Sequence, residues 1–221
     1  MPTISGHLNK MVTQLNAETG SKIQYQMSLD DHRIDLNPLV GQTIKMNYVG
    51  EIHCSHCGRK TNKSFSQGYC YPCFKKLPQC DLCIMSPEKC HYHLGTCRDS
   101  AWGDDFCMQD HYVYLANSSA LKVGITRGTQ LPTRWCDQGA TQGLPIFRVK
   151  DRLLSGLVET LFKQTLADKT NWRAMLKGEA ERIDLANIRD ELYQPVSYTN
   201  MTLPTNREVY ISLSGRCLNT K

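Results

Sequence analysis

Residues 54–73 read CSHCGRKTNKSFSQGYCYPC, and this stretch decides how the centre of the chain folds. It holds two Cys-x-x-Cys knuckles that are separated by twelve residues. Such spacing is typical of four thiolates that surround one zinc ion at the corners of a tetrahedron. Gly58 follows the first knuckle, at a place where the turn often needs a left-handed residue. We therefore predict a structural zinc site, closed by Cys54, Cys57, Cys70 and Cys73.

The alternative for these cysteines is a set of disulfide bonds or free thiols. The N-terminus shows no signal peptide, which favours a cytoplasmic protein, and disulfides are rare in the cytosol. No apolar run approaches the ~20 residues that a membrane-spanning helix needs. We therefore expect a cytoplasmic protein with no membrane partner, in which these cysteines bind metal.

A second and denser group of seven or eight candidate ligands follows the first. Cys80 and Cys83 form a third knuckle and are expected to act together. Spacing does not choose their partners, and a cross-braced arrangement or an iron–sulfur cluster stays open. Zinc is the default metal for mixed cysteine and histidine ligands, so we expect two or more structural zinc sites. The group runs Cys80, Cys83, Cys90, His91, His93, Cys97, Cys107 and His111. The predicted metal ligands among them are Cys80, Cys83, Cys90, Cys97, Cys107 and His111.

The charge of the chain permits a polyanionic partner without demanding one. The 221 residues carry a formal net charge of +5 and are 40% hydrophobic, as in a soluble protein of two or three small units. Basic residues gather beside the first zinc site, at Arg59, Lys60 and Lys63. They predict a nucleic-acid-binding surface, either for DNA or for RNA, and the competing explanation is an ordinary solvated surface.

Strand patterns precede and follow the cysteines. Residues 1–53 are expected to form a small antiparallel β unit, because Lys22–Met27, Arg33–Leu36 and Thr43–Val49 alternate polar and apolar side chains. Few of these side chains are large and apolar, so the unit should lean on the zinc module.

The chain after His111 predicts a mixed unit of strands and helices. Leu153, Leu157, Leu161 and Phe162 are expected on one face of the longest helix. The expected elements, in order, are a strand at Tyr112–Ala116, a strand at Leu121–Thr126, a helix at Pro132–Gln138, a strand at Pro145–Val149, a helix at Leu153–Leu166, a helix at Arg182–Tyr193 and a strand at Glu208–Leu213.

This order of elements resembles the GIY-YIG nuclease superfamily. Tyr112-Val-Tyr114 stands where that family has Gly-Ile-Tyr, and Lys122-Val-Gly124 stands where it has Tyr-Ile-Gly. The chain also resembles an uncharacterised bacterial and archaeal family of zinc-containing proteins, through its Cys-x-x-Cys-Gly knuckle and residues 132–140.

The nuclease resemblance implies roles for four residues. Tyr114 would help to activate water against a phosphodiester, Arg134 would steady the phosphate, and Glu159 would hold Mg²⁺. Lys122 replaces the second family tyrosine and could contact phosphate instead. Arg127 and Arg148 would add positive charge near the same face.

Structural explanations compete with each of these roles. One of the two tyrosines would simply be core, and Glu159 would be a charge on the solvent side of an amphipathic helix. The scaffold would then bind nucleic acid or protein without catalysis.

A third possibility is redox or iron sensing by the cysteines between Cys80 and Cys107. Cys136 and Cys217 are isolated and are expected to be buried thiols.

The sequence as a whole predicts an α+β protein. We expect an N-terminal antiparallel β unit over residues 1–53 and a Cys-rich zinc module over residues 54–110. A GIY-YIG-like α/β domain should follow over residues 111–178, and a helix and a strand over residues 179–221. The predicted function is that of a zinc-containing nucleic-acid-binding protein, either a Mg²⁺-dependent phosphodiesterase or a non-catalytic interaction module.

Overall fold

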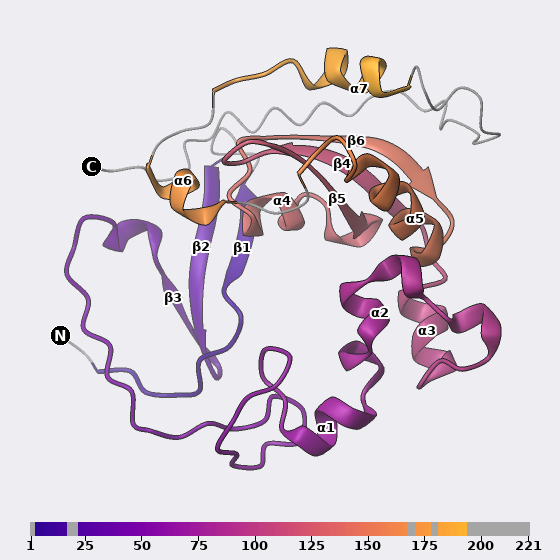
Figure 1. The fold of residues 1–221 in the computed structure, drawn as a ribbon. Helices are drawn as coiled ribbons and strands as arrows, with labels where there is room; N and C mark the ends of the chain where they lie inside the picture. The colour runs from indigo at the N-terminus through magenta and orange to yellow at the C-terminus, as the bar shows by residue number, and fades with distance from the viewer. Residues whose placement is uncertain (1–2, 17–21, 168–170, 178–180, 194–221) are drawn as a thin grey trace.

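The computed structural model describes residues 3–16, 22–167, 171–177 and 181–193. Two three-stranded antiparallel sheets flank a Cys-rich segment of short helices in the sequence (Figure 1). The chain is therefore of the α+β type. The strand predicted at Glu208–Leu213 and the thiol of Cys217 lie outside the described residues. None of the described helices has the length and apolar composition that crossing a bilayer requires.

The N-terminal sheet has the strand order β1-β2-β3. A tight turn with Asp30 at a φ of 49° joins the second strand to the third. The first strand was not predicted, because its sequence VTQLN does not alternate strictly. The bounds of the strands are Val12–Asn16 for β1, Lys22–Leu29 for β2 and His32–Asp35 for β3.

The strand predicted at Thr43–Val49 is wrong. These residues form no strand in the structure, and the side chains of Ile44, Met46 and Tyr48 are exposed. An alternating pattern becomes a strand only where another strand offers a free edge. The described residues provide no such partner for this segment.

The N-terminal sheet leans on the C-terminal half of the chain rather than on the zinc module. The Thr13 hydroxyl donates to a carboxylate oxygen of Asp137 at 2.7 Å, and Lys10 pairs with the other oxygen at 2.6 Å. Leu15 packs against the buried cluster that includes Tyr114. The expected support from the zinc module is thus replaced by a polar and apolar contact with helix α4, which spans Thr133–Asp137.

The Cys-rich segment is built from short helical turns. Its buried apolar residues are mostly cysteines, so it has little conventional hydrophobic core. Metal ions commonly replace the core in segments of this kind. Its α-helices are α1 (Tyr71–Lys76), α2 (Leu82–Met85) and α3 (Ser100–Phe106), and its 3₁₀ turns include Pro78–Cys80, Pro87–Lys89 and Tyr92–Leu94.

The second sheet has the strand order β5-β4-β6, so β4 is central. Tyr114 in β4 lies opposite Gly124, and Ala116 lies opposite Lys122. Residues that face each other across an antiparallel pair project to the same side of the sheet. The strands span His111–Asn117 (β4), Leu121–Arg127 (β5) and Gln142–Val149 (β6).

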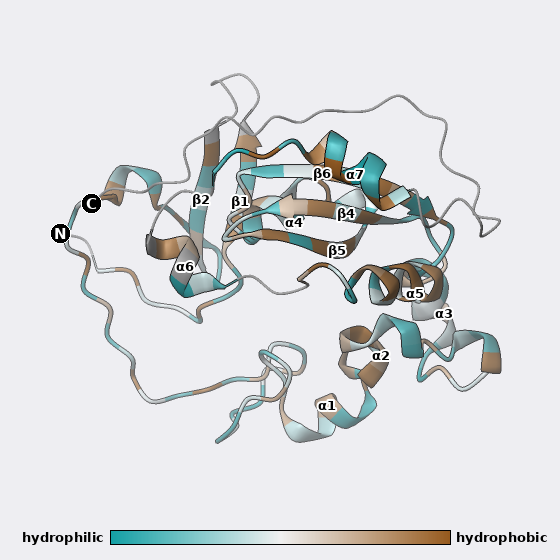
Figure 2. Ribbon diagram, turned by 45° about the horizontal axis from the view of Figure 1, so that its top comes forward, coloured by the Kyte–Doolittle hydropathy of each residue, from teal (hydrophilic) through white to brown (hydrophobic). Residues whose placement is uncertain are grey.

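The two faces of this sheet carry different cores. Val113, Leu115 and Val123 form the larger core with residues of helices α5 and α7. Tyr114 and Ala116 form the smaller one with Trp135 of α4 on the opposite face. Figure 2 shows the hydrophobic residues concentrated in β4, β5 and α5. The helices that complete the fold are α5 (Arg152–Phe162), α6 (Trp172–Lys177) and α7 (Leu185–Tyr193).

The buried face of α5 differs from the predicted one. Leu157 and Leu161 are 50% and 46% exposed, although the sequence pattern placed them in the core. The helix turns a different side inward because it packs on two partners at once, the sheet and the Cys-rich segment. The residues it buries are Ser155, Gly156, Val158, Glu159 and Phe162.

Candidate functional site

The first two knuckles form one compact group of four thiols. The sulfur atoms of this group all lie within 4.8 Å of one another. The Gly58 nitrogen donates to the Cys54 carbonyl at 2.9 Å, and Gly58 has a φ of 70°, as the sequence predicted for a left-handed turn residue. Helix α1 begins directly after Cys70 and places Cys73 in its first turn. The four members are Cys54, Cys57, Cys70 and Cys73.

The chemistry of this group fits a zinc ion. Four soft sulfur donors at this separation match the tetrahedral ligand set of a closed structural zinc site. Burial opposes ionisation of Cys54, but backbone N–H groups, led by that of Cys57, lower its pKa to about 6. Burial and the neighbouring thiols raise the pKa of Cys73 to about 12. The group is positioned to bind a metal such as zinc.

The third knuckle does not act as a unit in the structure. Cys80 interacts with Ser66, Arg98 and Cys54, toward the first group of thiols. Cys83 interacts instead with Cys90 and Cys107. Cys83 lines the pocket described below and Cys80 does not, so the two cysteines do not share that pocket. The 3₁₀ turn Pro78–Cys80 carries Cys80, and helix α2 carries Cys83.

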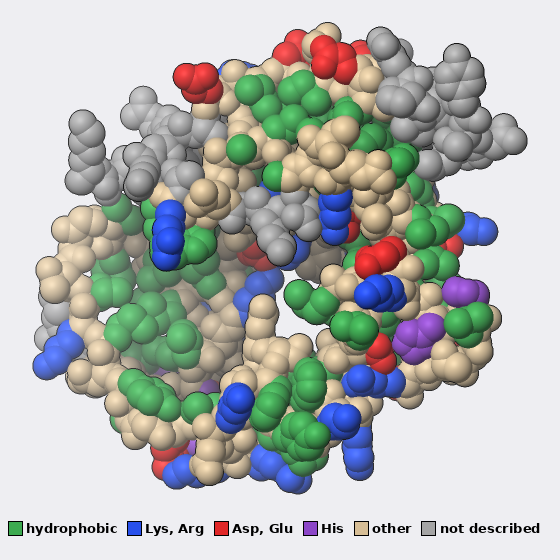
Figure 3. Space-filling view, viewed as in Figure 1, with side chains coloured by type: hydrophobic (Ala, Val, Ile, Leu, Met, Phe, Trp, Pro, Cys, Tyr) green, Lys and Arg blue, Asp and Glu red, His purple; other side chains and the backbone are tan. Residues whose placement is uncertain are grey.

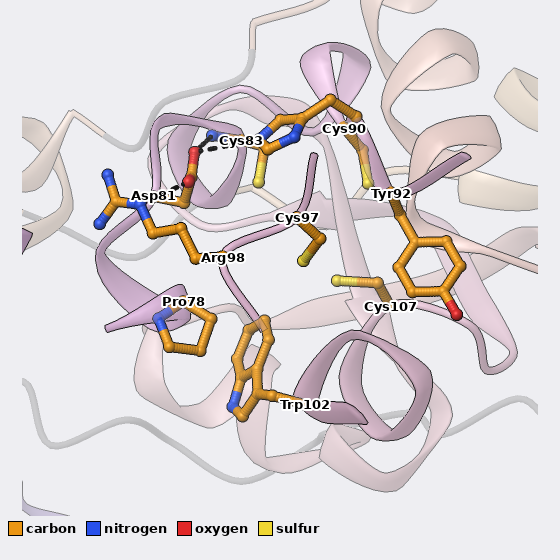
Figure 4. Close-up of a pocket in the computed structure, with 10 residues that line it drawn as sticks. Pro78, Asp81, Cys83, Cys90, Tyr92, Cys97, Arg98, Trp102 and Cys107 are labelled. Atoms are coloured by element: carbon orange, nitrogen blue, oxygen red, sulfur yellow. Dashed lines mark hydrogen bonds and ion pairs between the residues drawn. The ribbon is translucent and has the colours of Figure 1, made fainter. Parts of the chain in front are cut away.

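The remaining cysteines of the segment line one pocket together with Cys83. Figure 4 shows the sulfur atoms of Cys83, Cys90, Cys97 and Cys107 directed toward its interior. His111 does not line this pocket. It is fully buried, its Nδ1 lies 2.7 Å from the Gln109 carbonyl oxygen, and its Nε2 has no hydrogen-bond partner among the described residues. Burial, together with the charges of Arg152 and Arg127, lowers the pKa of His111.

Tyr114 lies at the meeting point of three elements. It is 1% exposed, and its hydroxyl group lies 3.0 Å from the Nε2 atom of Gln138 on the segment that ends α4. Burial raises the pKa of Tyr114, Arg134 of α4 opposes this effect, and the charge of Glu159 on α5 adds to it. Arg134 and Glu159 thus both lie close enough to Tyr114 to influence its ionisation.

The tyrosine ring also explains the glycine opposite it. A Cβ atom at Gly124 would lie 2.7 Å from the hydroxyl oxygen of Tyr114. The ring therefore occupies the space that a side chain at position 124 would need. Gly124 in β5 therefore has a packing role.

Lys122 and Glu159 are both buried. Lys122 is 4% exposed and shares the sheet face of Tyr114, since it lies opposite Ala116. Glu159 is 8% exposed and pairs with Lys163 at 3.1 Å, so the explanation of Glu159 as a solvent-facing charge is wrong. Among the described residues, no group of three potential metal ligands includes Glu159.

The basic residues fall into two sets. Arg59, Lys60 and Lys63 are exposed on the knuckle segment, although Lys60 also pairs with Glu51 at 2.6 Å. Arg148 is held by Asp110, with its Nε atom 2.8 Å from the carboxylate. Arg127 stacks on Phe106 and lies opposite His111, so it projects from the face away from Tyr114. The expectation that Arg127 lies near the same face is wrong, because position 127 is an odd number of residues from Gly124.

Sequence reasoning missed several members of the Tyr114 surroundings. Gln138 lies four residues after Arg134, a spacing that places two side chains on one side of a helix and could have indicated it. Trp135 packs edge-on against Tyr114 with ring centres 6.0 Å apart. Lys163 follows Glu159 by four residues, which is the usual spacing of a helical ion pair. Cys136 is buried, as expected.

The fold and the site define a class of protein: a mixed α+β chain with a four-cysteine group positioned for a metal such as zinc. The chain belongs to the DUF2797 family of proteins of unknown function, whose model matches residues 41–213. The expected membership of an uncharacterised family is confirmed by this match. No curated protein and no solved structure matches the chain.

Proposed function

We propose that this chain is a zinc-containing nucleic-acid-binding protein and that it contacts single-stranded segments through the module around its first four thiols. The observation that carries the proposal is the exposed basic surface of this module. Figure 3 shows Lys and Arg side chains gathered over the part of the molecule where Figure 1 places α1 and the knuckles. The exposed residues of this surface, here called the basic surface, are Arg59, Lys60, Lys63, Lys75 and Lys76.

Aromatic rings lie among these charges. Phe65 stacks on Phe74 with ring centres 5.6 Å apart, and it contacts Tyr71 at 5.5 Å. Tyr71 is 54% exposed, and the ammonium group of Lys63 lies 5.4 Å from the Phe65 ring centre. Cationic grooves with exposed aromatic side chains bind single strands, because phosphates pair with the charges while bases stack on the rings. An exposed tyrosine beside lysines supports this mode of binding over a plain solvated surface.

The test is the affinity of the full chain for labelled single-stranded DNA and RNA, followed by fluorescence anisotropy over a range of salt concentrations. We expect affinity to fall steeply with salt, with a slope of about −0.7 per phosphate neutralised. Replacing Lys75 and Lys76 with alanine should weaken binding and reduce the slope by about 0.7 for each phosphate that is no longer neutralised. Tyr71→Ala should weaken binding with little change in slope, at a cost of about 1–3 kcal/mol.

A matched control uses a lysine outside the basic surface. Lys150 is exposed between β6 and α5, so Lys150→Ala removes one charge without touching the module. Its affinity should stay close to that of the unchanged protein. Binding that ignores salt, or that is equally weak in the Lys75/Lys76 variant and the Lys150 variant, would overturn the proposal.

Phosphodiester hydrolysis is the second candidate function, and the convergence of Tyr114, Arg134 and Glu159 favours it. Because burial raises the pKa of Tyr114, its phenol is protonated at neutral pH and acts as a hydrogen-bond donor. Arg134 is exposed and could reach a phosphate from solvent. Glu159 would be the protein's ligand to Mg²⁺, an ion that proteins commonly hold with one or two carboxylates and substrate phosphates.

The hydrolysis test measures cleavage of a mixed DNA and RNA panel with Mg²⁺. If Glu159 is a metal ligand, Glu159→Gln should abolish cleavage, and Tyr114→Phe should reduce it strongly, while zinc content stays unchanged. The control is Glu191→Gln, because Glu191 is an exposed carboxylate on α7. If the protein binds the substrates of the panel but cleaves none of them, the proposal of hydrolysis is overturned and the proposal of nucleic-acid binding stands. Cleavage that survives both active-site variants would also remove it.

A further inference from the structure

The pocket in the second half of the Cys-rich segment gathers thiols from four separate turns. Cys83 lies in α2, Cys90 ends the 3₁₀ turn Pro87–Lys89, and Cys107 ends α3. Cys97 lies between the last two. Figure 4 shows all four sulfur atoms directed into the pocket, from different sides. Three of them, in Cys83, Cys90 and Cys107, are less than 10% exposed.

These thiols interact with one another but form no disulfides. The charge of Cys90 acts on both Cys83 and Cys107, and Cys97 acts on Cys107. All four are free cysteines. Four cysteine sulfur atoms that point into one largely buried pocket are a donor set that suits zinc. Among the described residues no three of these sulfur atoms lie within 4.8 Å of one another, so a bound ion would draw them closer together.

Other candidate ligands near the pocket are already engaged. Asp81 caps α2 by accepting from the Cys83 nitrogen, and its second oxygen pairs with the Arg98 Nε atom at 2.7 Å. The Nδ1 atom of His91 lies 2.8 Å from the Thr96 hydroxyl, and its Nε2 atom faces Asp81 at 3.4 Å. Asp81, Cys83 and His91 do lie within 4.8 Å of one another, but the first of them serves as a helix cap and a counter-ion.

The pocket is built directly against the helix that carries Glu159. The Arg152 side chain donates to the Ile84 carbonyl at 2.7 Å, and the Arg152 backbone nitrogen donates to the Cys107 carbonyl at 2.9 Å. Gly156 packs on the backbone of Glu88 in the turn that precedes Cys90. Helix α5 therefore contacts a pocket cysteine directly and also contacts residues within two positions of two others.

We propose that Cys83, Cys90, Cys97 and Cys107 bind a second zinc ion and that this ion shapes the surface on which α5 docks. Cys80 and His111 are not ligands of this ion, because neither residue lines the pocket. The site is structural, since four thiolates complete the tetrahedral coordination of zinc. Its role is to hold the turns from Leu82 to Cys107 in the arrangement that receives the first turns of α5.

The test measures zinc in the purified full chain by elemental analysis, with matched cysteine variants. The unchanged protein should hold about two equivalents per chain, and Cys83→Ser should hold about one. Cys80→Ser is the control from the same Cys-x-x-Cys sequence and should keep both. His91→Gln should also keep both. If Cys83→Ser does not fold, Cys97→Ser is the second variant, because Cys97 is partly exposed.

One equivalent in the unchanged protein, or loss of an ion in Cys80→Ser or His91→Gln, would overturn the ligand set. A visible absorption band in freshly purified protein would show an iron–sulfur cluster and would overturn the assignment of zinc. For the docking role, hydrogen exchange of the α5 amides should speed up by about tenfold or more in Cys83→Ser and stay unchanged in Cys57→Ser. Equal exchange in both variants would overturn that role.

Discussion

Gly156 of α5 lies directly against the backbone of Glu88 in the Cys-rich segment. A Cβ atom at position 156 would stand 2.4 Å from the Glu88 nitrogen and 2.6 Å from the carbonyl carbon of Pro87. These are backbone atoms, which cannot rotate away as the end of a side chain can. The helix and the turn therefore meet at a position that only glycine can occupy without displacing one of them.

Gly156→Ala should destabilise the protein. Overpacking of this kind typically costs about 1–3 kcal/mol, and in a chain of this length each kcal/mol lowers Tm by roughly 2–4 °C. Thermal unfolding followed by circular dichroism measures the effect. Leu157→Ala is the neighbouring control, since Leu157 is 50% exposed and its loss should change Tm little. Equal Tm values for the two variants would show that the close contact does not exist in solution.

The buried face of α5 can be tested with a second pair of neighbours. Phe162 is 4% exposed and stacks with Phe147 at a ring-centre distance of 5.7 Å, whereas Leu161 is 46% exposed. Phe162→Ala should cost about 3–5 kcal/mol of unfolding free energy. Leu161→Ala should cost much less, and urea denaturation of both variants measures the difference. A larger cost for Leu161→Ala would restore the face that the sequence predicted.

Elements with long periodic patterns could be predicted from the sequence, and elements without them could not. The strands β4, β5 and β6 and the helix α5 were expected within a few residues of their observed bounds. The buried face of α5 was not predicted correctly, because the hydrophobic pattern of the helix cannot show that Gly156 packs on the distant turn at Glu88. The segment 43–49 shows the reverse error, a strand pattern without a partner among the described residues.

Parts of the candidate sites that depend on local spacing could be predicted from the sequence, and parts that depend on long-range packing could not. The spacing of the first four cysteines indicated their grouping, since two Cys-x-x-Cys knuckles bring their thiols together locally. The partners of Cys83 depend on where later turns bring Cys90 and Cys107, so spacing left them open. The pairing of Tyr114 with Gln138 was missed because it depends on how α4 lies across the sheet.

Burial of Tyr114 should make the stability of the folded protein fall at alkaline pH. Burial raises the pKa of Tyr114 in the folded state. In the unfolded chain the same phenol ionises at pH ~10, where the folded protein still keeps it protonated. The stabilising effect is complete below the unfolded pKa and is lost as the pH rises from there through the folded pKa. Urea denaturation at neutral pH and near pH ~11 should therefore show a loss of stability that is smaller in Tyr114→Phe.

The same variant loses a hydrogen bond at neutral pH. Gln138 would keep no phenol partner, which should cost about 1 kcal/mol. Tyr112→Phe is the control, since Tyr112 is less buried and lies on the same face of β4. An identical pH profile for Tyr114→Phe and the unchanged protein would mean that Tyr114 ionises freely and is not enclosed as the structure places it.

Asp137 joins the N-terminal sheet to the rest of the chain. Its carboxylate accepts from the Thr13 hydroxyl at 2.7 Å and pairs with Lys10 at 2.6 Å. Thr13 is 6% exposed, so Asp137→Ala leaves a buried hydroxyl without this partner, at a cost of about 1–3 kcal/mol. Asp137→Ala should loosen the contact between the N-terminal sheet and α4 and leave the sheet of β4, β5 and β6 intact.

Limited proteolysis measures this effect and should cut faster in the exposed segment 41–51. Asp35→Ala is the control, because it removes a contact with Gln26 inside the N-terminal sheet and should not speed up cleavage. Unchanged cleavage in Asp137→Ala would mean that the apolar contact of Leu15 suffices to hold the sheet in place.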